Sequence, residues 1–200
     1  MTEKIFNADD YNKYEEGNRI ILSSGVERIS VMVDRVQDFS GLEGKTIGLH
    51  ADFGGESMAD FLGLIFNPRR VEKLLEAQID KFRKVFGKLP DHLDSHRYLH
   101  LFPFVLPVFI RACRKHKISN LRMSRHGVVK IKNLKSFIIH FMVKTSYLFC
   151  RKRLEGLVFC DYFLSLDWYD KIDFKLPDGV ISVIYHPEND IKLLRQLQKN

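Results

Sequence analysis

Long hydrophobic runs are missing from this chain, and so is an apolar leader at its start. The two longest apolar stretches, around residues 99–110 and 137–150, are broken by proline, histidine or lysine. Neither reaches the roughly 18 apolar residues that a membrane-spanning helix needs. The first residues, Met1 to Lys4, lead into a strand-like segment rather than into the apolar core of a signal peptide. These absences predict a chain that neither crosses a membrane nor carries a secretion signal.

Cysteine is scarce as well. The three cysteines, Cys113, Cys150 and Cys160, are odd in number and widely spaced, so they form neither a disulfide framework nor a paired metal motif. A reducing, cytoplasmic location is therefore expected. The chain also lacks internal repeats, low-complexity segments and Pro/Gly/Ser linkers. We expect a single domain over residues 1–200, a length sufficient to bury a substantial core.

Positive charge is in excess. The net charge is +7, and the surplus lies in the second half, in clusters at residues 111–117, 122–135 and 151–153. Such a balance favours an anionic partner, such as a membrane surface, nucleic acid or a phosphate-bearing substrate. A solvated basic face explains the same clusters, and the sequence leaves both interpretations open.

The remaining sequence alternates between strand-like and helical patterns. Strands are predicted at 3–8, 28–33, 45–50, 91–95, 118–122, 156–161 and 180–185, and helices at 13–24, 68–86, 103–116, 134–152 and 188–198. This alternation is typical of an α/β fold with a parallel sheet. About seven strands fit either an open sheet or a distorted, TIM-like β/α barrel.

Candidate metal ligands follow several of these strands. Asp9 and Asp10 end the first, His50 ends the third, and His96 follows the fourth. In a barrel the carboxyl ends of the strands form one rim, where these side chains can meet, so we favour the barrel. A carboxylate and two imidazoles leave open positions on a divalent ion for water and substrate. Taken singly, each group is also compatible with a helix cap or a turn.

Two further histidines extend this set. His100 lies four residues after His96, a spacing that puts both on one face of a helix. Asp94 is placed to orient a histidine by a hydrogen bond. His186 follows the last predicted strand, where it could donate a proton to a leaving group or simply begin the next helix.

The string Asn7-Ala8-Asp9-Asp10-Tyr11 resembles the N-terminal signature of the YdjC-like carbohydrate deacetylases, a family that includes chitooligosaccharide deacetylases. Residues 47–50, 90–96 with His100, 160–163 and 185–187 resemble further motifs of this family, in the same order. The resemblance implies a distorted β/α barrel that hydrolyses an N-acetyl group on a sugar with one divalent metal ion, Mg²⁺ or Zn²⁺.

The resemblance also implies roles for individual residues. The metal ligands would be Asp10, His50 and His96, the general base Asp9, and the acid for the departing amine His186. Arg122 would position Asp9 or contact the substrate, and we place His100 on the substrate side as well. Two positions depart from the family pattern: Asn12 stands where glycine is usual, and Tyr98 where a histidine is frequent.

The sequence thus predicts a metal-dependent hydrolase that removes the acetyl group from an N-acetylated sugar, oligosaccharide or glycoconjugate. One alternative is a metal hydrolase acting on a lipid-linked or phosphorylated sugar at an anionic membrane surface, suggested by the apolar and basic stretch 135–153. Another is a non-catalytic barrel that binds anionic partners. Nucleic acid is disfavoured because no recognised binding motif is present. Whether the chain forms a homodimer stays open.

Overall fold

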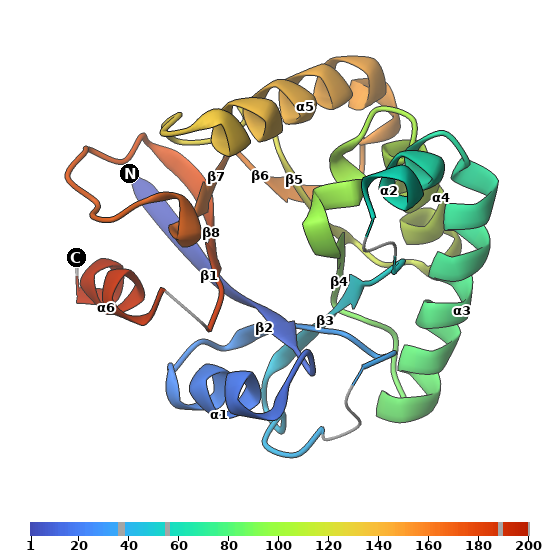
Figure 1. Ribbon diagram of the computed structural model, residues 1–200, viewed down its shortest axis with the longest axis horizontal. Coiled ribbons are helices and arrows are strands. Elements are labelled where there is room, and N and C mark those ends of the chain that lie inside the picture. The colour runs from blue at the N-terminus through green and yellow to red at the C-terminus, as the bar shows by residue number, and fades with distance from the viewer. Residues whose placement is uncertain (36–38, 55–56, 188–189, 200) are drawn as a thin grey trace.

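The centre of the molecule is a parallel sheet of eight strands. The computed structural model describes residues 1–35, 39–54, 57–187 and 190–199. The strands are β1 (Thr2–Tyr11), β2 (Arg28–Val31), β3 (Thr46–Ala51), β4 (His92–Ser95), β5 (Asn120–Ser124), β6 (Val158–Cys160), β7 (Tyr162–Ser165) and β8 (Gly179–Tyr185). They lie in the order β6-β5-β4-β3-β2-β1-β8-β7 and curl into a nearly closed barrel (Figure 1). The predicted α/β barrel is confirmed, with eight strands rather than about seven.

The extra strand comes from the segment predicted as one strand at 156–161. The chain changes partners at Asp161: β6 pairs with β5, whereas β7 pairs with β8. The seam between the two ends of the sheet is bridged by the segment that follows β5. The Arg125 amide donates to the Cys160 carbonyl over 3.0 Å, and the Val129 amide donates to the Phe163 carbonyl over 2.8 Å. These bonds close the barrel without a continuous ladder between β6 and β7.

Helices cover the outside of the barrel (Figure 1). They are α1 (Glu15–Ser23), α2 (Met58–Ile65), α3 (Pro68–Phe86), α4 (Leu106–His116), α5 (Leu134–Cys150) and α6 (Ile191–Lys199), with short 3₁₀ turns η1 (His96–Leu101), η2 (Arg151–Arg153) and η3 (Leu166–Trp168). Helix α3 has the predicted bounds. Helix α2 was not predicted, and the predicted start of the last helix at 188–189 lies outside the described residues. Within the described ranges, no helix is both long and apolar enough to cross a membrane.

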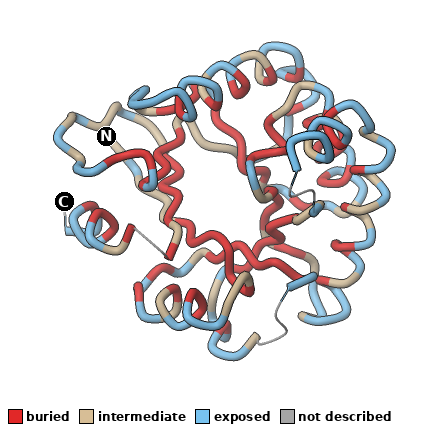
Figure 2. The backbone as a smooth tube through the Cα atoms, in the orientation of Figure 1, coloured by how far each residue is buried: buried red, intermediate tan, exposed pale blue. Residues whose placement is uncertain are grey.

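The strands supply most of the buried backbone, as Figure 2 shows, but the barrel interior is not wholly apolar. Its middle layer buries Asn7, Ser30, His92, Asp94 and Arg122. A Cβ atom built on Gly48 would lie 2.2 Å from the His92 ring, so this position of β3 must be glycine for His92 to fit. The polar layer supports the side chains at the carboxyl ends of the strands.

Candidate metal and catalytic site

Three side chains from different strand ends meet at the carboxyl-terminal mouth of the barrel. One ligand atom from each of Asp10, His50 and His96 lies within 4.8 Å of the others. Asp10 Oδ1 is 3.3 Å from His50 Nε2 and 3.2 Å from His96 Nδ1. The structure therefore brings together the three residues that the sequence analysis assigned to a metal ion.

The backbone at the end of β1 explains how adjacent aspartates reach the same site. Successive side chains of a regular strand point in opposite directions. The register of β1 against β2 shifts between Ala8 and Tyr11, and Asp10 has a left-handed φ of 63°. Both Asp9 and Asp10 consequently line one cavity. Asp10 uses its other oxygen, Oδ2, to bind the Lys13 ammonium group at 3.0 Å.

The orientation of His50 is set by Asp94. His50 Nδ1 hydrogen-bonds the fully buried Asp94 carboxylate, which directs Nε2 toward Asp10. Burial lowers the pKa of His50, but the Asp94 and Asp9 carboxylates outweigh it and raise that pKa to about 10. A nitrogen lone pair that faces a carboxylate oxygen needs a cation between them, either a proton or a metal ion. The donor set of one carboxylate and two imidazoles thus fits a divalent ion.

Arg122 fixes the second carboxylate. Its guanidinium binds both oxygens of Asp9 and also reaches Asp94, while its Nη2 donates to Ser30 Oγ over 2.7 Å. Asn7 Nδ2 donates to Asp9 Oδ1 over 2.7 Å. A second ligand group of Asp9, His50 and Asp94 is also compact. Arg122 already binds both carboxylates of this second group, so the Asp10 group is the better candidate for a metal ion.

His100 does not reach the cavity, contrary to its predicted place on the substrate side. Arg97 and Tyr98 both have left-handed backbone, with φ of 56° and 57°, so His96 and His100 do not share a helical face. Ser95 donates to Nδ1 of the fully buried His100, and Nε2 of His100 donates to the Arg122 carbonyl over 2.7 Å. Burial lowers the pKa of His100 to about 3. Its geometry is that of a neutral support behind Arg122.

His186 lines the same cavity as the metal-ligand group, at the end of β8. Its Nδ1 lies 3.6 Å from an Asp190 oxygen and 3.9 Å from an Asp167 oxygen. Burial lowers the pKa of His186, but Asp190 and the nearby carboxylates Asp9 and Asp10 outweigh it and raise that pKa. The sequence analysis did not identify Asp167 and Asp190. Each is an isolated aspartate, and no sequence pattern shows that it will lie beside His186 in the folded chain.

The cavity at this mouth has a volume of about 470 Å³. One part of its wall is polar and contains the aspartates and histidines already described. The other part is apolar and comes from α2, the residue after η1, and α5, through Met58, Phe61, Phe102, Ile138, Ile139 and Met142. The site can therefore hold a ligand with a polar reacting group next to apolar surface.

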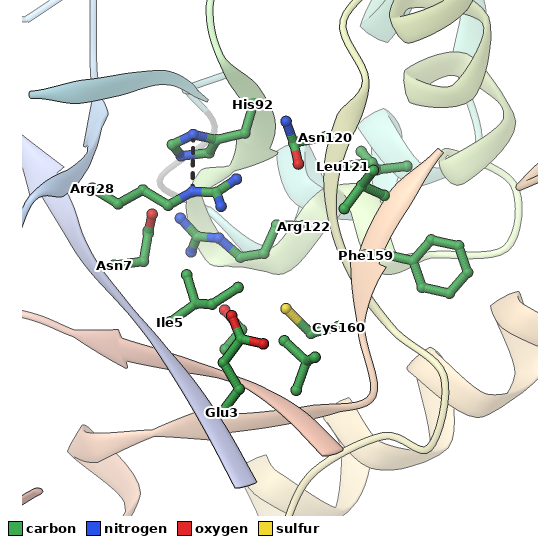
Figure 3. Close-up of a pocket in the computed structure, with 13 residues that line it drawn as sticks. Glu3, Ile5, Asn7, Arg28, His92, Asn120, Leu121, Arg122, Phe159 and Cys160 are labelled. Carbon is green, nitrogen blue, oxygen red and sulfur yellow. Dashed lines mark hydrogen bonds between the residues drawn. The ribbon is translucent and has the colours of Figure 1, made fainter. Parts of the chain in front are cut away.

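A smaller cavity of about 270 Å³ lies at the opposite end of the barrel (Figure 3). It is lined by the early residues of several strands, including Glu3 and Arg28. Arg28 Nε donates to His92 Nδ1 over 3.3 Å, and the Arg28 guanidinium lies beside that of Arg122 in the view of Figure 3. None of the three assigned metal ligands lines this cavity. The candidate metal ligands therefore lie away from this cavity, at the carboxyl-terminal mouth.

Comparison with known proteins identifies the family of this chain. The family model described as YdjC-like protein matches residues 5–187, a range that includes every strand end of the site. The chain belongs to the YdjC-like family. Locally, 54 residues are 41% identical to proteins named chitooligosaccharide deacetylase in Yersinia pestis (strain Pestoides F) and Yersinia pseudotuberculosis (strain IP 31758). That match covers 27% of this chain and 21% of each relative's length.

A solved structure shares the fold of this YdjC-like chain. It is a candidate cellobiose-phosphate cleavage protein of Enterococcus faecalis V583, which superposes with a TM-score of 0.66 over 100% of this chain and 94% of its own. The sequence identity is 16%, so this similarity establishes the barrel and not the reaction.

Proposed function

We propose that this YdjC-like protein is a metal-dependent hydrolase that removes the acetyl group from an N-acetylated saccharide. The observation that carries the proposal is the convergence, in one cavity, of Asp10, His50 and His96 with two further titratable side chains, Asp9 and His186. Family membership and the local similarity to chitooligosaccharide deacetylases support the same reaction.

Asp10, His50 and His96 would hold the divalent ion. When bound, such an ion polarises a carbonyl oxygen and lowers the pKa of a bound water molecule. The chain prepares the ligands for this task. Asp94 keeps the Nε2 lone pair of His50 directed at the site, and Lys13 holds Asp10 through its other oxygen. Both Mg²⁺ and Zn²⁺ are compatible with this donor set.

Asp9 is the general base of the proposed reaction. Arg122 fixes the plane of this carboxylate through both of its oxygens, while the carboxylate still lines the cavity where the attacking water would lie. His186 is the proton donor to the departing amine, because Asp167 and Asp190 favour its protonated form. Tyr98 also lines the cavity, and its hydroxyl lies 2.9 Å from Ser165 Oγ. Because the Ser165 hydroxyl donates to Asp167, Tyr98 is the donor to Ser165, and it shapes the wall.

The experiment measures bound metal and acetate release together, with N-acetylglucosamine oligosaccharides as the substrate. We expect His50→Ala to lose both the metal ion and turnover. Asp9→Asn should keep the metal ion and lose turnover by about 10²–10⁴-fold, which is the range for removal of a general base. His116→Ala is the matched control, because His116 pairs with Glu76 on the outside of the barrel.

Each arm can contradict the proposal. Full metal binding in folded His50→Ala would remove His50 from the ligand set, and full turnover in Asp9→Asn would remove Asp9 as the base. Metal bound by the wild-type chain without acetate release from any N-acetylated saccharide would leave the metal site in place and reject the deacetylase reaction. Circular dichroism establishes that each variant is folded.

A further inference from the structure

Helix α5 is apolar on two sides. Its inner side packs on the barrel through residues such as Ile139 and Val143. Its outer side exposes a second apolar stripe at helical spacing, made of Leu134, Phe137, Ile138, Phe141, Leu148 and Phe149. Phe141 is 64% exposed and Phe149 is 77% exposed. The pale blue turns of α5 in Figure 2 mark this uncovered side. An apolar stripe of this length is unusual on the free surface of a soluble monomer.

The stripe continues onto neighbouring elements. Phe104 lies between α5 and α2, and its ring centroid is 6.2 Å from that of Phe66. Phe66, Met58 and Leu62 are exposed on α2 and the residue that follows it. We call the α5 stripe, Phe104 and these three residues the α5–α2 surface. Met58 and Ile138 also line the catalytic cavity, so this surface borders the entrance to the proposed site.

Positive charge accompanies this surface. Residues 95–154 contain no Asp or Glu but hold 14 of the 32 Lys and Arg residues of the chain. Some of these cations pair with acidic side chains elsewhere, as Lys135 does with Asp167. Among the described residues, Lys144, Arg151, Lys152 and Arg153 have no carboxylate within ion-pair distance. Unneutralised cations therefore lie along α5 and directly after it.

Apolar and basic groups also meet in a groove of about 750 Å³ at the end of α5. Phe104 and two prolines form one side of the groove, Leu148 and Phe149 form the other, and Arg151–Arg153 provide the cations. This combination matches an acyl chain below an anionic headgroup. Apolar area and a basic cluster together are the two signals that hold a peripheral protein on a bilayer.

We propose that the α5–α2 surface docks on an anionic lipid bilayer and turns the catalytic mouth toward it. If the proposed deacetylation is correct, the substrate is then an N-acetylated saccharide carried on a lipid. The glycan would enter beside the metal ligands, while its lipid stays against the apolar wall of Ile138 and Met142.

A second copy of the chain fits this surface less well. Both ends of α5 are basic, with Lys130 and Lys132 before it and Arg151–Arg153 after it. Lys132 pairs with Asp170 at the start of α5, but Arg151–Arg153 at its end have no such partner among the described residues. A twofold contact that brings the same ends of two α5 helices together would place these unpaired cations against one another. An anionic bilayer neutralises the same charges.

The test is co-sedimentation of the full chain with vesicles of phosphatidylcholine, with and without phosphatidylglycerol. We expect binding only to the anionic vesicles. Phe141→Ser should weaken this binding about tenfold or more, and Lys152→Gln about fivefold, the effect of one cation at an anionic surface. Val85→Ser and Lys84→Gln on α3 are matched controls that should leave binding unchanged, because both residues are exposed outside the surface.

Equal binding by wild type and Phe141→Ser, or no binding to anionic vesicles, overturns the docking. So does a dimer in solution that Phe141→Ser converts to a monomer, since the surface would then join two copies. Acetate release distinguishes the two proposals. Phe141→Ser should reduce release from an N-acetylglucosaminyl lipid in vesicles but not from soluble oligosaccharides. No release from either substrate, with vesicle binding intact, rejects the deacetylase reaction alone.

Discussion

Replacing Arg122 with methionine tests whether one buried cation holds the carboxyl-terminal end of the barrel together. In the wild-type chain the guanidinium lies in a forked contact with Asp9 and also binds Asp94, and all three side chains are almost completely buried. Burial lowers the pKa of Arg122, but the two carboxylates outweigh it and raise that pKa. Methionine fills much of the same volume but leaves two buried carboxylates without their shared cation.

The size of the effect follows from that geometry. Removing one partner of a buried ion pair costs about 3–5 kcal/mol, because the remaining charge is uncompensated. We therefore expect Arg122→Met to lower the free energy of unfolding at pH 7 by about 3–5 kcal/mol. For a domain of this length, that corresponds to a fall in Tm of roughly 6–20 °C.

Urea unfolding of the metal-free proteins, followed by circular dichroism, measures this loss. Arg125→Met is the control, because Arg125 is half-exposed and its nitrogen lies 3.7 Å from the Asp161 carboxylate. That variant should lose less than about 1 kcal/mol, as exposed ion pairs do. A loss of the same small size in Arg122→Met would refute the argument that Arg122 compensates buried charge.

Two further predictions concern the interior of the barrel. His100 is buried as a neutral ring, with a pKa of about 3 against an ordinary value near 6.5. Its contribution to the free energy of unfolding is therefore complete above pH 6.5 and is lost as the pH falls toward 3. Between pH 7 and pH 5 the wild type should lose about 2 kcal/mol more unfolding free energy than His100→Met, and equal losses would contradict this. Gly48→Ala should cost about 1–3 kcal/mol through overlap with His92, whereas Gly63→Ala on α2, with open space around it, should gain up to about 1 kcal/mol. Thermal melts compare these two variants, and equal effects would show that the ring of His92 can move aside.

The sequence was most informative where a strand ended in a polar residue. His50 and His186 each follow a short β-branched or apolar run, and Asp10 ends the first such run, so their positions at the mouth could be predicted from periodicity and parallel topology alone. That argument needs only the direction of each strand and the closure of the sheet. It does not depend on side-chain contacts.

Features that depend on contacts between distant residues could not be predicted. The partner change at Asp161 divides one apolar run into β6 and β7, and a run of that kind does not show which neighbour each half will choose. The left-handed backbone at Arg97 and Tyr98 separates His100 from His96 although their spacing is helical.

Helix α2, in contrast, could have been predicted from the sequence. Ser57 and Asp60 form a capping pattern before an apolar run, and the Ser57 side chain accepts a hydrogen bond from the Asp60 amide.

The departure from the family pattern at Asn12 has a structural explanation. Asn12 has a φ of 70°, in the region where glycine is favoured and where asparagine is among the best-tolerated other residues. Its side chain also makes a contact that glycine cannot, because Asn18 Nδ2 donates to Asn12 Oδ1 over 2.9 Å. The Asn12 amide in turn donates to Asn18 Oδ1 over 2.7 Å. This reciprocal pair ties the end of β1 to α1, so the substitution secures the turn that presents Asp10 instead of disturbing it.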